Sequence, residues 1–240
     1  MPQQFLSITD AYRATSVFGK LTRHEISAWA LTGGLAVEIH RLRHGRPSGL
    51  RALNDLDFVT DSFDCVPDSL AGDFLFRHIH PLDPPGKTML QLVDPVNALR
   101  IDVFRANGAT MERTVCLEAA FGTVRLISLE DLVARSARLV LEIGEGRPAS
   151  VKHATDFLRL LEFVNPAKIE TAWQDHRKPQ HPATFEETRM LLENLISNRK
   201  QLLITPKYST NSSEKCLRCA PTSAFRLADP DVVLSLLGYC

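Results

Sequence analysis

The segment Leu53-Asn54-Asp55-Leu56-Asp57-Phe58-Val59 decides how the rest of this chain is interpreted. Its apolar residues predict a strand over residues 53–60. In a strand, residues i and i+2 point to one face, so the carboxylates of Asp55 and Asp57 should lie side by side. Two like charges on an apolar strand repel each other unless a positive group lies between them. A divalent cation is such a group, and the pattern therefore indicates a metal site.

A third acid lies in a second apolar run, Leu99-Arg100-Ile101-Asp102-Val103-Phe104. A solvated surface residue would be unusual inside such a strand. If the two strands are neighbours, Asp55, Asp57 and Asp102 form an oxygen cage of the kind that Mg²⁺ prefers. The alternative is that these acids are outward positions on half-exposed strands, because Asp-x-Asp is a common tripeptide.

Two glycines add a second element. Thr32-Gly33-Gly34 follows a predicted strand over residues 26–31 and precedes a predicted helix. Glycines at such a turn let the backbone approach a ligand closely, and the first amides of a helix favour a phosphate. A tight turn explains the pair equally well when it is taken alone. Beside the acids, it predicts phosphate-facing amides next to a metal cage.

Composition excludes several classes of protein. The chain has 240 residues, with 28 basic and 28 acidic side chains, and 44% of its residues are hydrophobic. These values argue against disorder and against a protein that coats nucleic acid non-specifically. No run approaches the roughly 20 apolar residues of a membrane helix, and the first ten residues lack a signal-peptide pattern. Five widely spaced cysteines suit reduced thiols. We therefore expect a cytoplasmic protein without a membrane segment.

The order of predicted elements indicates an α/β (α+β) fold with a helical C-terminal region. Strands are predicted at residues 26–31, 53–60, 74–79, 89–93, 99–104 and, as the last strand, 122–127. Helices are predicted at residues 7–21, after Gly34, and at 128–141, 150–163, 166–175 and 185–203, with Ser128 as an N-cap. We expect a catalytic domain over 1–143, a helical region over 144–204 and a tail over 205–240, whose last apolar segment docks on the body.

These motifs, in this order, resemble the nucleotidyltransferase superfamily related to DNA polymerase beta. Within it, the chain is similar to minimal enzymes of the AbiEii toxin and aminoglycoside nucleotidyltransferase kind. The resemblance covers residues 28–163. It is carried by the segments Thr32-Gly33-Gly34-Leu35-Ala36, Arg51 to Val59, Arg100-Ile101-Asp102-Val103-Phe104, Ser128-Leu129-Glu130-Asp131-Leu132 and Lys152-x3-Asp156. It implies a mixed twisted sheet flanked by helices, followed by the helical region.

The resemblance also implies roles for the acids. Asp55 and Asp57 would hold metal and the triphosphate, while Asp102 would bind a second metal and accept the proton of an attacking hydroxyl. Two ions suit in-line attack on a phosphate, because they stabilise both the entering and the leaving oxygens. The implied cofactor is Mg²⁺, with Mn²⁺ as an alternative, and the implied substrate is a nucleoside triphosphate.

The nucleotide-binding residues follow from the same resemblance. Thr32, Gly33 and Gly34 would contact the phosphates. Lys152 would neutralise charge on the nucleotide or on the leaving pyrophosphate, and an ion pair with Asp156 on the helix surface is the alternative.

The chain also departs from the family pattern. It offers Arg135 and Ser136 where many AbiEii-like proteins have a lysine, and it adds a loop over residues 43–49 that could reach the substrate.

The tail carries two further patterns. Cys216-x2-Cys219 with Cys240, completed by His176 or His181, would supply zinc ligands, but a single Cys-x2-Cys is weak evidence and we expect ordinary thiols instead. Basic residues also gather in the tail and could hold RNA phosphates or be solvated; they are Arg199, Lys200, Lys207, Lys215, Arg218 and Arg226.

The sequence therefore predicts a Mg²⁺-dependent nucleotidyltransferase that moves a nucleoside monophosphate onto a hydroxyl. The acceptor is left open between tRNA, a protein side chain and a small molecule such as an aminoglycoside. A toxin role, with a cognate antitoxin as partner, follows from the resemblance alone. The alternative hypothesis is a nucleotidyltransferase-like protein that binds a nucleotide or a partner without catalysis.

Overall fold

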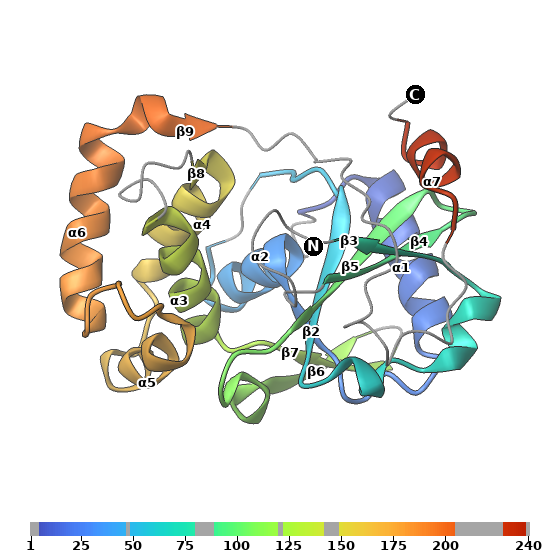
Figure 1. Ribbon diagram of the computed structural model, residues 1–240, viewed down its shortest axis with the longest axis horizontal. Coiled ribbons are helices and arrows are strands. Elements are labelled where there is room, and N and C mark those ends of the chain that lie inside the picture. The colour runs from blue at the N-terminus through green and yellow to red at the C-terminus, as the bar shows by residue number, and fades with distance from the viewer. Residues whose placement is uncertain are drawn as a thin grey trace.

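A seven-stranded mixed sheet forms the centre of the molecule, for which we have a computed structural model (Figure 1). The structure describes residues 5–46, 49–79, 89–119, 122–141, 149–204 and 228–238. The strand order is β3-β4-β5-β2-β1-β7-β6. The strands are β1 (Ala30–Thr32), β2 (Asp55–Thr60), β3 (Leu75–Ile79), β4 (Met89–Asp94), β5 (Leu99–Arg105), β6 (Val115–Ala119) and β7 (Gly122–Leu126). The predicted fold class, a mixed sheet flanked by helices, is confirmed.

The helices divide between the two sides of the sheet. They are α1 (Ile8–Leu21), α2 (Gly33–Arg43), α3 (Leu129–Val140), α4 (Val151–Leu161), α5 (Pro166–His176), α6 (Phe185–Asn198) and α7 (Pro230–Leu236). Helices α3 to α6 gather beside the sheet together with a small sheet of β8 (Ala149–Ser150) and β9 (Leu203–Ile204), as the left half of Figure 1 shows. None of the described helices is long and apolar enough to cross a bilayer.

Local signals in the sequence start several of these helices. The Ser7 hydroxyl accepts a hydrogen bond from the Asp10 amide at 3.0 Å, and the Ser128 hydroxyl accepts one from the Asp131 amide at 3.0 Å. Each side chain therefore satisfies an amide that the helix itself leaves unpaired. The predicted N-cap at Ser128 is confirmed.

The two faces of β2 are different. Leu56 and Phe58 point into the core, where Phe58 meets Phe18 of α1 edge to face with ring centroids 5.8 Å apart. Asp55 and Asp57 point to the other face, as the alternation predicts. Since the apolar face is fixed in the core, the acidic face is fixed toward the helices α2 and α4.

Two predicted elements are wrong in their bounds, and one strand was not predicted. Residues 26–29 form a turn, in which the Trp29 amide donates to the Ile26 carbonyl at 2.9 Å, so that strand begins only at Ala30. Strand β6 was not predicted, because it is a half-exposed strand with polar residues, and β7 is not the last strand. The predicted helix over 185–203 ends at Asn198, since a 3-10 turn (Lys200–Leu202) and β9 follow it.

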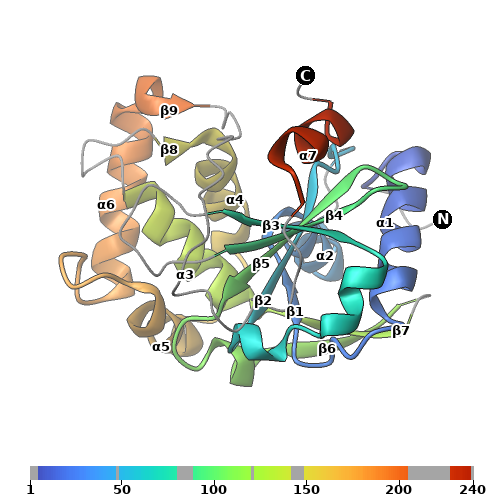
Figure 2. The ribbon, with the colours of Figure 1, turned by 45° about the vertical axis from the view of Figure 1, so that its right-hand side comes forward.

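The ends of the predicted domains lie mostly outside the described residues. The structure does not describe the boundary at residues 143 and 144 or most of the tail, residues 205–227. The three-part division therefore stays a prediction. The tail does return to the sheet, because the Ala228 amide donates to the Phe76 carbonyl of β3 at 2.7 Å. Helix α7 follows at once, with Val233 fully buried, and lies beside this end of the sheet in Figure 2.

Candidate functional site

Three carboxylates converge on the open face of the sheet. Strands β2 and β5 are parallel neighbours, and their register places Asp57 beside Asp102. On its other side, Asp57 lies opposite Thr32 of β1. One carboxylate oxygen from each of Asp55, Asp57 and Asp102 lies within 4.8 Å of the others. The condition set by the sequence, that the two acidic strands are neighbours, is therefore met.

The positive charges near this cluster do not offset the effect of burial on two of its carboxylates, Asp57 and Asp102. Burial raises the pKa of Asp57, and the charge of Asp55 raises it further. Burial also raises the pKa of Asp102 to about 7, although the nearby Arg100 opposes the shift. Carboxyl groups with such pKa values are stabilised in their ionised form by an added cation. The donor set consists only of carboxylate oxygens, which is what a hard divalent ion takes.

Arg100 is part of the site and was not predicted. Its guanidinium pairs with Asp55 across the β2–β5 register, and its Nε lies 3.2 Å from Oδ2 of Asp102. Gln91 of β4 donates to Asp102 Oδ1 at 2.7 Å. Because Arg100 and Asp102 are two residues apart in one strand, they share a face. The i, i+2 spacing of Arg100 and Asp102 could have indicated that Arg100 faces the site. Its pairing with Asp55 could be predicted only if β2 were known to be the neighbouring strand.

The two glycines make room for side chains of the site. Gly33 has φ +63°, and a Cβ built there would lie 1.7 Å from Asp57 Oδ2. A Cβ on Gly34 would lie 2.6 Å from Nη2 of Arg51. Gly33 therefore needs glycine because of the close approach of Asp57 and because of its left-handed backbone, whereas a side chain at position 34 would have to displace the Arg51 guanidinium. Contact of these glycines with phosphates stays a prediction.

Thr32 binds an arginine of α3. Its side chain is fully buried and its hydroxyl accepts a hydrogen bond from Arg135 Nη1 at 3.2 Å. The Arg135 guanidinium also lies over the ring of Phe104, 4.5 Å from its centroid. Burial lowers the pKa of Arg135, and the charges of Asp57 and Asp102 oppose that shift. Arg135, which was noted only as a departure from the family pattern, is therefore a cation of the site.

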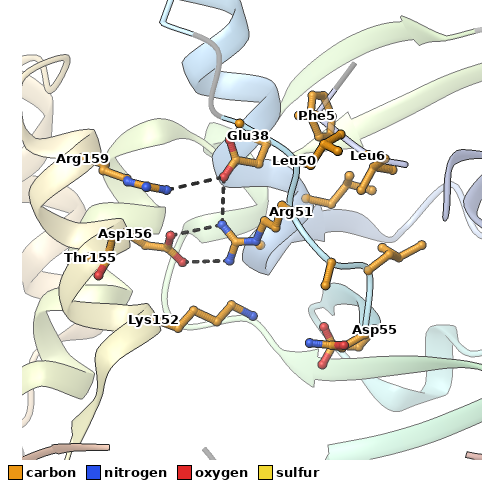
Figure 3. A pocket seen from close by; sticks show the side chains of 16 residues that line it. Phe5, Leu6, Glu38, Leu50, Arg51, Asp55, Lys152, Thr155, Asp156 and Arg159 are labelled. Carbon is orange, nitrogen blue, oxygen red and sulfur yellow. Dashed lines mark hydrogen bonds and ion pairs between the residues drawn. The ribbon is translucent and has the colours of Figure 1, made fainter. Parts of the chain in front are cut away.

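Two cavities meet at the acidic cluster and share Gly34, Asp55, Lys152 and Asp156. The α2–α4 cavity has a volume of about 490 Å³ and is shown in Figure 3. Its other lining residues include Phe5, Leu6, Glu38, Leu50, Arg51, Thr155 and Arg159. The α3–α4 cavity has a volume of about 310 Å³, and its other lining residues include Gly33, Asp57, Phe104, Arg135 and His153. Burial lowers the pKa of His153 to about 3, so this imidazole is neutral at pH 7.

Lys152 projects across the α2–α4 cavity toward Asp55 (Figure 3). Among the described residues the ammonium group of Lys152 has no hydrogen bond or ion pair. Asp156, one turn further along α4, pairs instead with Arg51, to which both its oxygens bind at 3.2 Å. The alternative role of Lys152, an ion pair with Asp156, is therefore wrong, and its ammonium group faces the cavity.

The proposed zinc ligands do not form a cluster in the described part of the chain. Cys216, Cys219 and Cys240 lie outside it. His176 is buried and hydrogen-bonded to Asp131 Oδ1 at 3.0 Å, while His181 stacks on Trp173 with centroids 6.0 Å apart. Both histidines are thus accounted for within the helical region.

No family model matches this chain, and no curated protein matches it. Solved structures resemble it at low identity, among them the following three. An antigenic nucleotidyltransferase-like protein from Paracoccidioides brasiliensis is 16% identical, with a TM-score of 0.44 over 82% of this chain and 95% of that one. The solution structure of the antibiotic-resistance factor ANT(2'')-Ia is 16% identical, with a TM-score of 0.41 over 80% and 97%. Its crystal structure with adenylyl-2''-tobramycin is 17% identical, with a TM-score of 0.39 over 69% and 94%.

Proposed function

We propose that this chain is a nucleotidyltransferase, which transfers a nucleoside monophosphate from a nucleoside triphosphate onto a hydroxyl group. The convergence of Asp55, Asp57 and Asp102 within 4.8 Å is the observation that supports it. Three converging carboxylates, of which Asp102 is buried, lie beside a glycine turn and an unpaired lysine, and this set suits a triphosphate with its metal ions better than a neutral ligand.

The residues of the cluster fit a divalent ion. Mg²⁺–oxygen bonds are about 2.1 Å long, so opposite ligands of one ion lie about 4.2 Å apart. The carboxylate oxygens of Asp55, Asp57 and Asp102 all lie within 4.8 Å of one another, an upper limit slightly above this largest separation. These three residues would hold Mg²⁺ or Mn²⁺, with Asp55 and Asp57 binding metal and the triphosphate and Asp102 binding the second ion. Bound ions of this kind stabilise charge on the entering and leaving oxygens of the phosphoryl group.

The side chains around the cluster have distinct roles in this proposal. The acceptor oxygen attacks the α-phosphorus, the bond to the pyrophosphate oxygen breaks, and the acceptor proton passes to Asp102. Lys152 and Arg135 compensate the charge of the triphosphate and of the departing pyrophosphate. Thr32, Gly33 and Gly34 contact the phosphates at the start of α2, where helix amides point outward.

The finer parts of the proposal concern the acceptor. The candidates are tRNA, a protein side chain and a small molecule such as an aminoglycoside. An AbiEii-type toxin role, with a cognate antitoxin as partner, rests on the resemblance in sequence alone. Both cavities adjoin Asp55, so one has room for the nucleotide while the other receives the acceptor.

A second candidate function is nucleotide or partner binding without catalysis. The position of Arg100 favours it, because this guanidinium already pairs with Asp55 and Asp102. An internal cation that stays in place would compensate the carboxylates without a metal ion. The chain would then bind a triphosphate through Lys152 and leave it intact.

Transfer of label from α-³²P nucleoside triphosphates tests the proposal. Each of the four nucleotides is offered with Mg²⁺ or Mn²⁺ and with RNA, protein or aminoglycoside acceptors. We expect the wild type to label one acceptor class and Asp55→Asn/Asp57→Asn to label none. Asp61→Asn is the matched control, since Asp61 is an exposed acid just after the same strand. A wild type that binds nucleotide but labels nothing would favour the second candidate.

A further inference from the structure

Arg51 joins three separate parts of the chain. It lies in the segment before β2, and its Nη1 donates to Glu38 Oε1 of α2 at 3.0 Å. Its Nη1 and Nη2 also donate to the two carboxylate oxygens of Asp156 on α4, each at 3.2 Å (Figure 3). The side chains of Glu38 and Asp156 are only 1% and 6% exposed. The bidentate pairing of the Arg51 guanidinium with the Asp156 carboxylate sets both the distance and the orientation of α4 relative to the segment before β2.

The guanidinium of Arg51 is held by these two carboxylates through three hydrogen bonds. A guanidinium held in this way is not available to a phosphate, although it lines the α2–α4 cavity. Its path also requires Gly34, where a Cβ would lie 2.6 Å from Arg51 Nη2. The absence of a side chain at Gly34 therefore leaves room at the start of α2 for the Arg51 guanidinium, which binds Glu38 and Asp156.

Lys152 lies on α4, the helix that also carries Asp156. It precedes Asp156 by four residues on α4, so the two side chains share one face of that helix. Asp156 is tied to Arg51, whereas the Lys152 ammonium has no partner among the described residues and extends toward Asp55 (Figure 3). Burial raises the pKa of Asp57, and the charge of Lys152 opposes this shift, which places that charge near the acidic cluster.

We propose that the Arg51–Asp156 ion pair positions Lys152. It fixes the polar face of α4 against α2 and the segment before β2, so that the Lys152 ammonium stays over Asp55. Arg51 and Asp156 are positioning residues that touch no substrate. The inference rests on the proposed function, in which Lys152 meets the triphosphate. The competing explanation is that the apolar face of α4, with Ala154, Phe157 and Leu160 buried, fixes the helix without the ion pair.

Two variants separate these explanations. Arg51→Lys keeps the charge but loses the fork, and Asp156→Asn keeps the shape but loses the charge. We expect kcat of each to fall about 10²-fold, because a displacement of about 1 Å in a positioned group costs that much. The KM for the nucleotide should change far less. Wild-type kcat in both variants would overturn the proposal.

A double-mutant cycle identifies the group that the ion pair acts through. In a Lys152→Ala background, Asp156→Asn should lower kcat little further, because the residue being positioned has gone. A merely structural ion pair would give losses that multiply. Multiplying losses would therefore overturn the proposal.

Arg113→Lys is the matched control for lost stability. Arg113 pairs with Asp131 of α3 through two hydrogen bonds of 2.9 and 2.6 Å, away from both cavities of the site. We expect this variant to lower the unfolding temperature at unchanged kcat. An equal fall of kcat in this control would mean that the losses at Arg51 are general destabilisation, and the proposal would fail.

A second readout does not need the transfer reaction. If the wild type transfers no nucleotide, the proposed function fails, and the ion pair is tested by acylation of lysines followed by peptide mass analysis. The rate at Lys152, relative to the exposed Lys168 of α5, should change at least about twofold in Asp156→Asn. An unchanged ratio would overturn the positioning role independently of activity.

Discussion

The carboxylate of Asp57 occupies the space that a side chain on Gly33 would need. A Cβ on Gly33 would lie 1.7 Å from Asp57 Oδ2, and Gly33 has φ +63°. The turn into α2 and the carboxylate on β2 are therefore compatible only when residue 33 has no side chain. This contact holds the start of α2 directly against the acidic cluster.

Gly33→Ala should abolish most activity. The alanine meets a left-handed backbone, which costs about 1–2 kcal/mol, and it must also displace Asp57. Gly45→Ala is the matched control, because Gly45 has φ +68° but nothing within 4 Å of its Cβ position. Both variants should lose unfolding free energy in urea, whereas only Gly33→Ala should lose about 10²-fold in label transfer. Equal activity of the two variants would contradict the role of this contact.

Metal ions should stabilise the wild type through the three carboxylates. Added Mg²⁺ or Mn²⁺ binds only the folded state, so the unfolding temperature should rise with ion concentration. Asp57→Asn should remove most of this rise. In EDTA the same variant should be as stable as the wild type or more so, because it relieves repulsion from Asp55. Asp61→Asn serves as the control and should respond to the ions as the wild type does.

Arg100→Gln should bind Mn²⁺ about tenfold more tightly than the wild type. The guanidinium pairs with Asp55 and Asp102, and a divalent ion must compete with it for those oxygens. The metal-free variant should in turn lose stability, since its carboxylates keep less positive charge nearby. Titration calorimetry with Mn²⁺ measures the affinity. Weaker binding would mean that Arg100 orients the carboxylates for the ion.

Stability in acid should depend on Asp131. Burial alone would raise the pKa of this carboxyl, but hydrogen bonds from His176, Arg113 and Ser128 outweigh burial and hold the pKa well below its usual range. The unfolded chain therefore binds a proton near pH 4, where the folded protein does not. This contribution to stability is complete above about pH 5 and is lost as the pH falls below about 4.

Asp131→Asn checks that contribution. The variant should be less stable than the wild type at pH 7, and its unfolding free energy should fall less steeply between about pH 5 and pH 3. Urea unfolding at a series of pH values gives both quantities. Parallel pH profiles for the two proteins would contradict the assignment.

The acidic cluster was open to prediction because alternation within a strand fixes which residues share a face. Asp55 and Asp57 needed only that rule, and Asp102 needed the further condition that its strand is a neighbour. Arg51, Arg100 and Arg135 could not be assigned in this way. Each acts across elements, from the segment before β2 to α4, from β5 to β2, or from α3 to β1. A local pattern gives the face of a residue but not the partner across the fold.

The same limit explains the errors in the elements. Ile26, Ala28 and Trp29 are apolar and Trp29 lies in the core, but apolar character alone does not distinguish a strand from a turn. Strand β6 has two exposed polar or thiol side chains, Cys116 and Glu118, and forms the edge of the sheet beyond β7. An edge strand of this kind carries little hydrophobic pattern.

The hydrogen bond from the Ala228 amide to the Phe76 carbonyl affects self-association of the protein at high concentration. Strand β3 ends the sheet order, and the outer backbone groups of a terminal strand are a template on which another chain can add a strand. The Ala228 amide donates a hydrogen bond to one of those groups, the Phe76 carbonyl, and α7 follows Ala228 in the chain. The contact at Ala228 therefore covers part of this edge and hinders pairing with a strand of another chain, at a place remote from the acidic cluster.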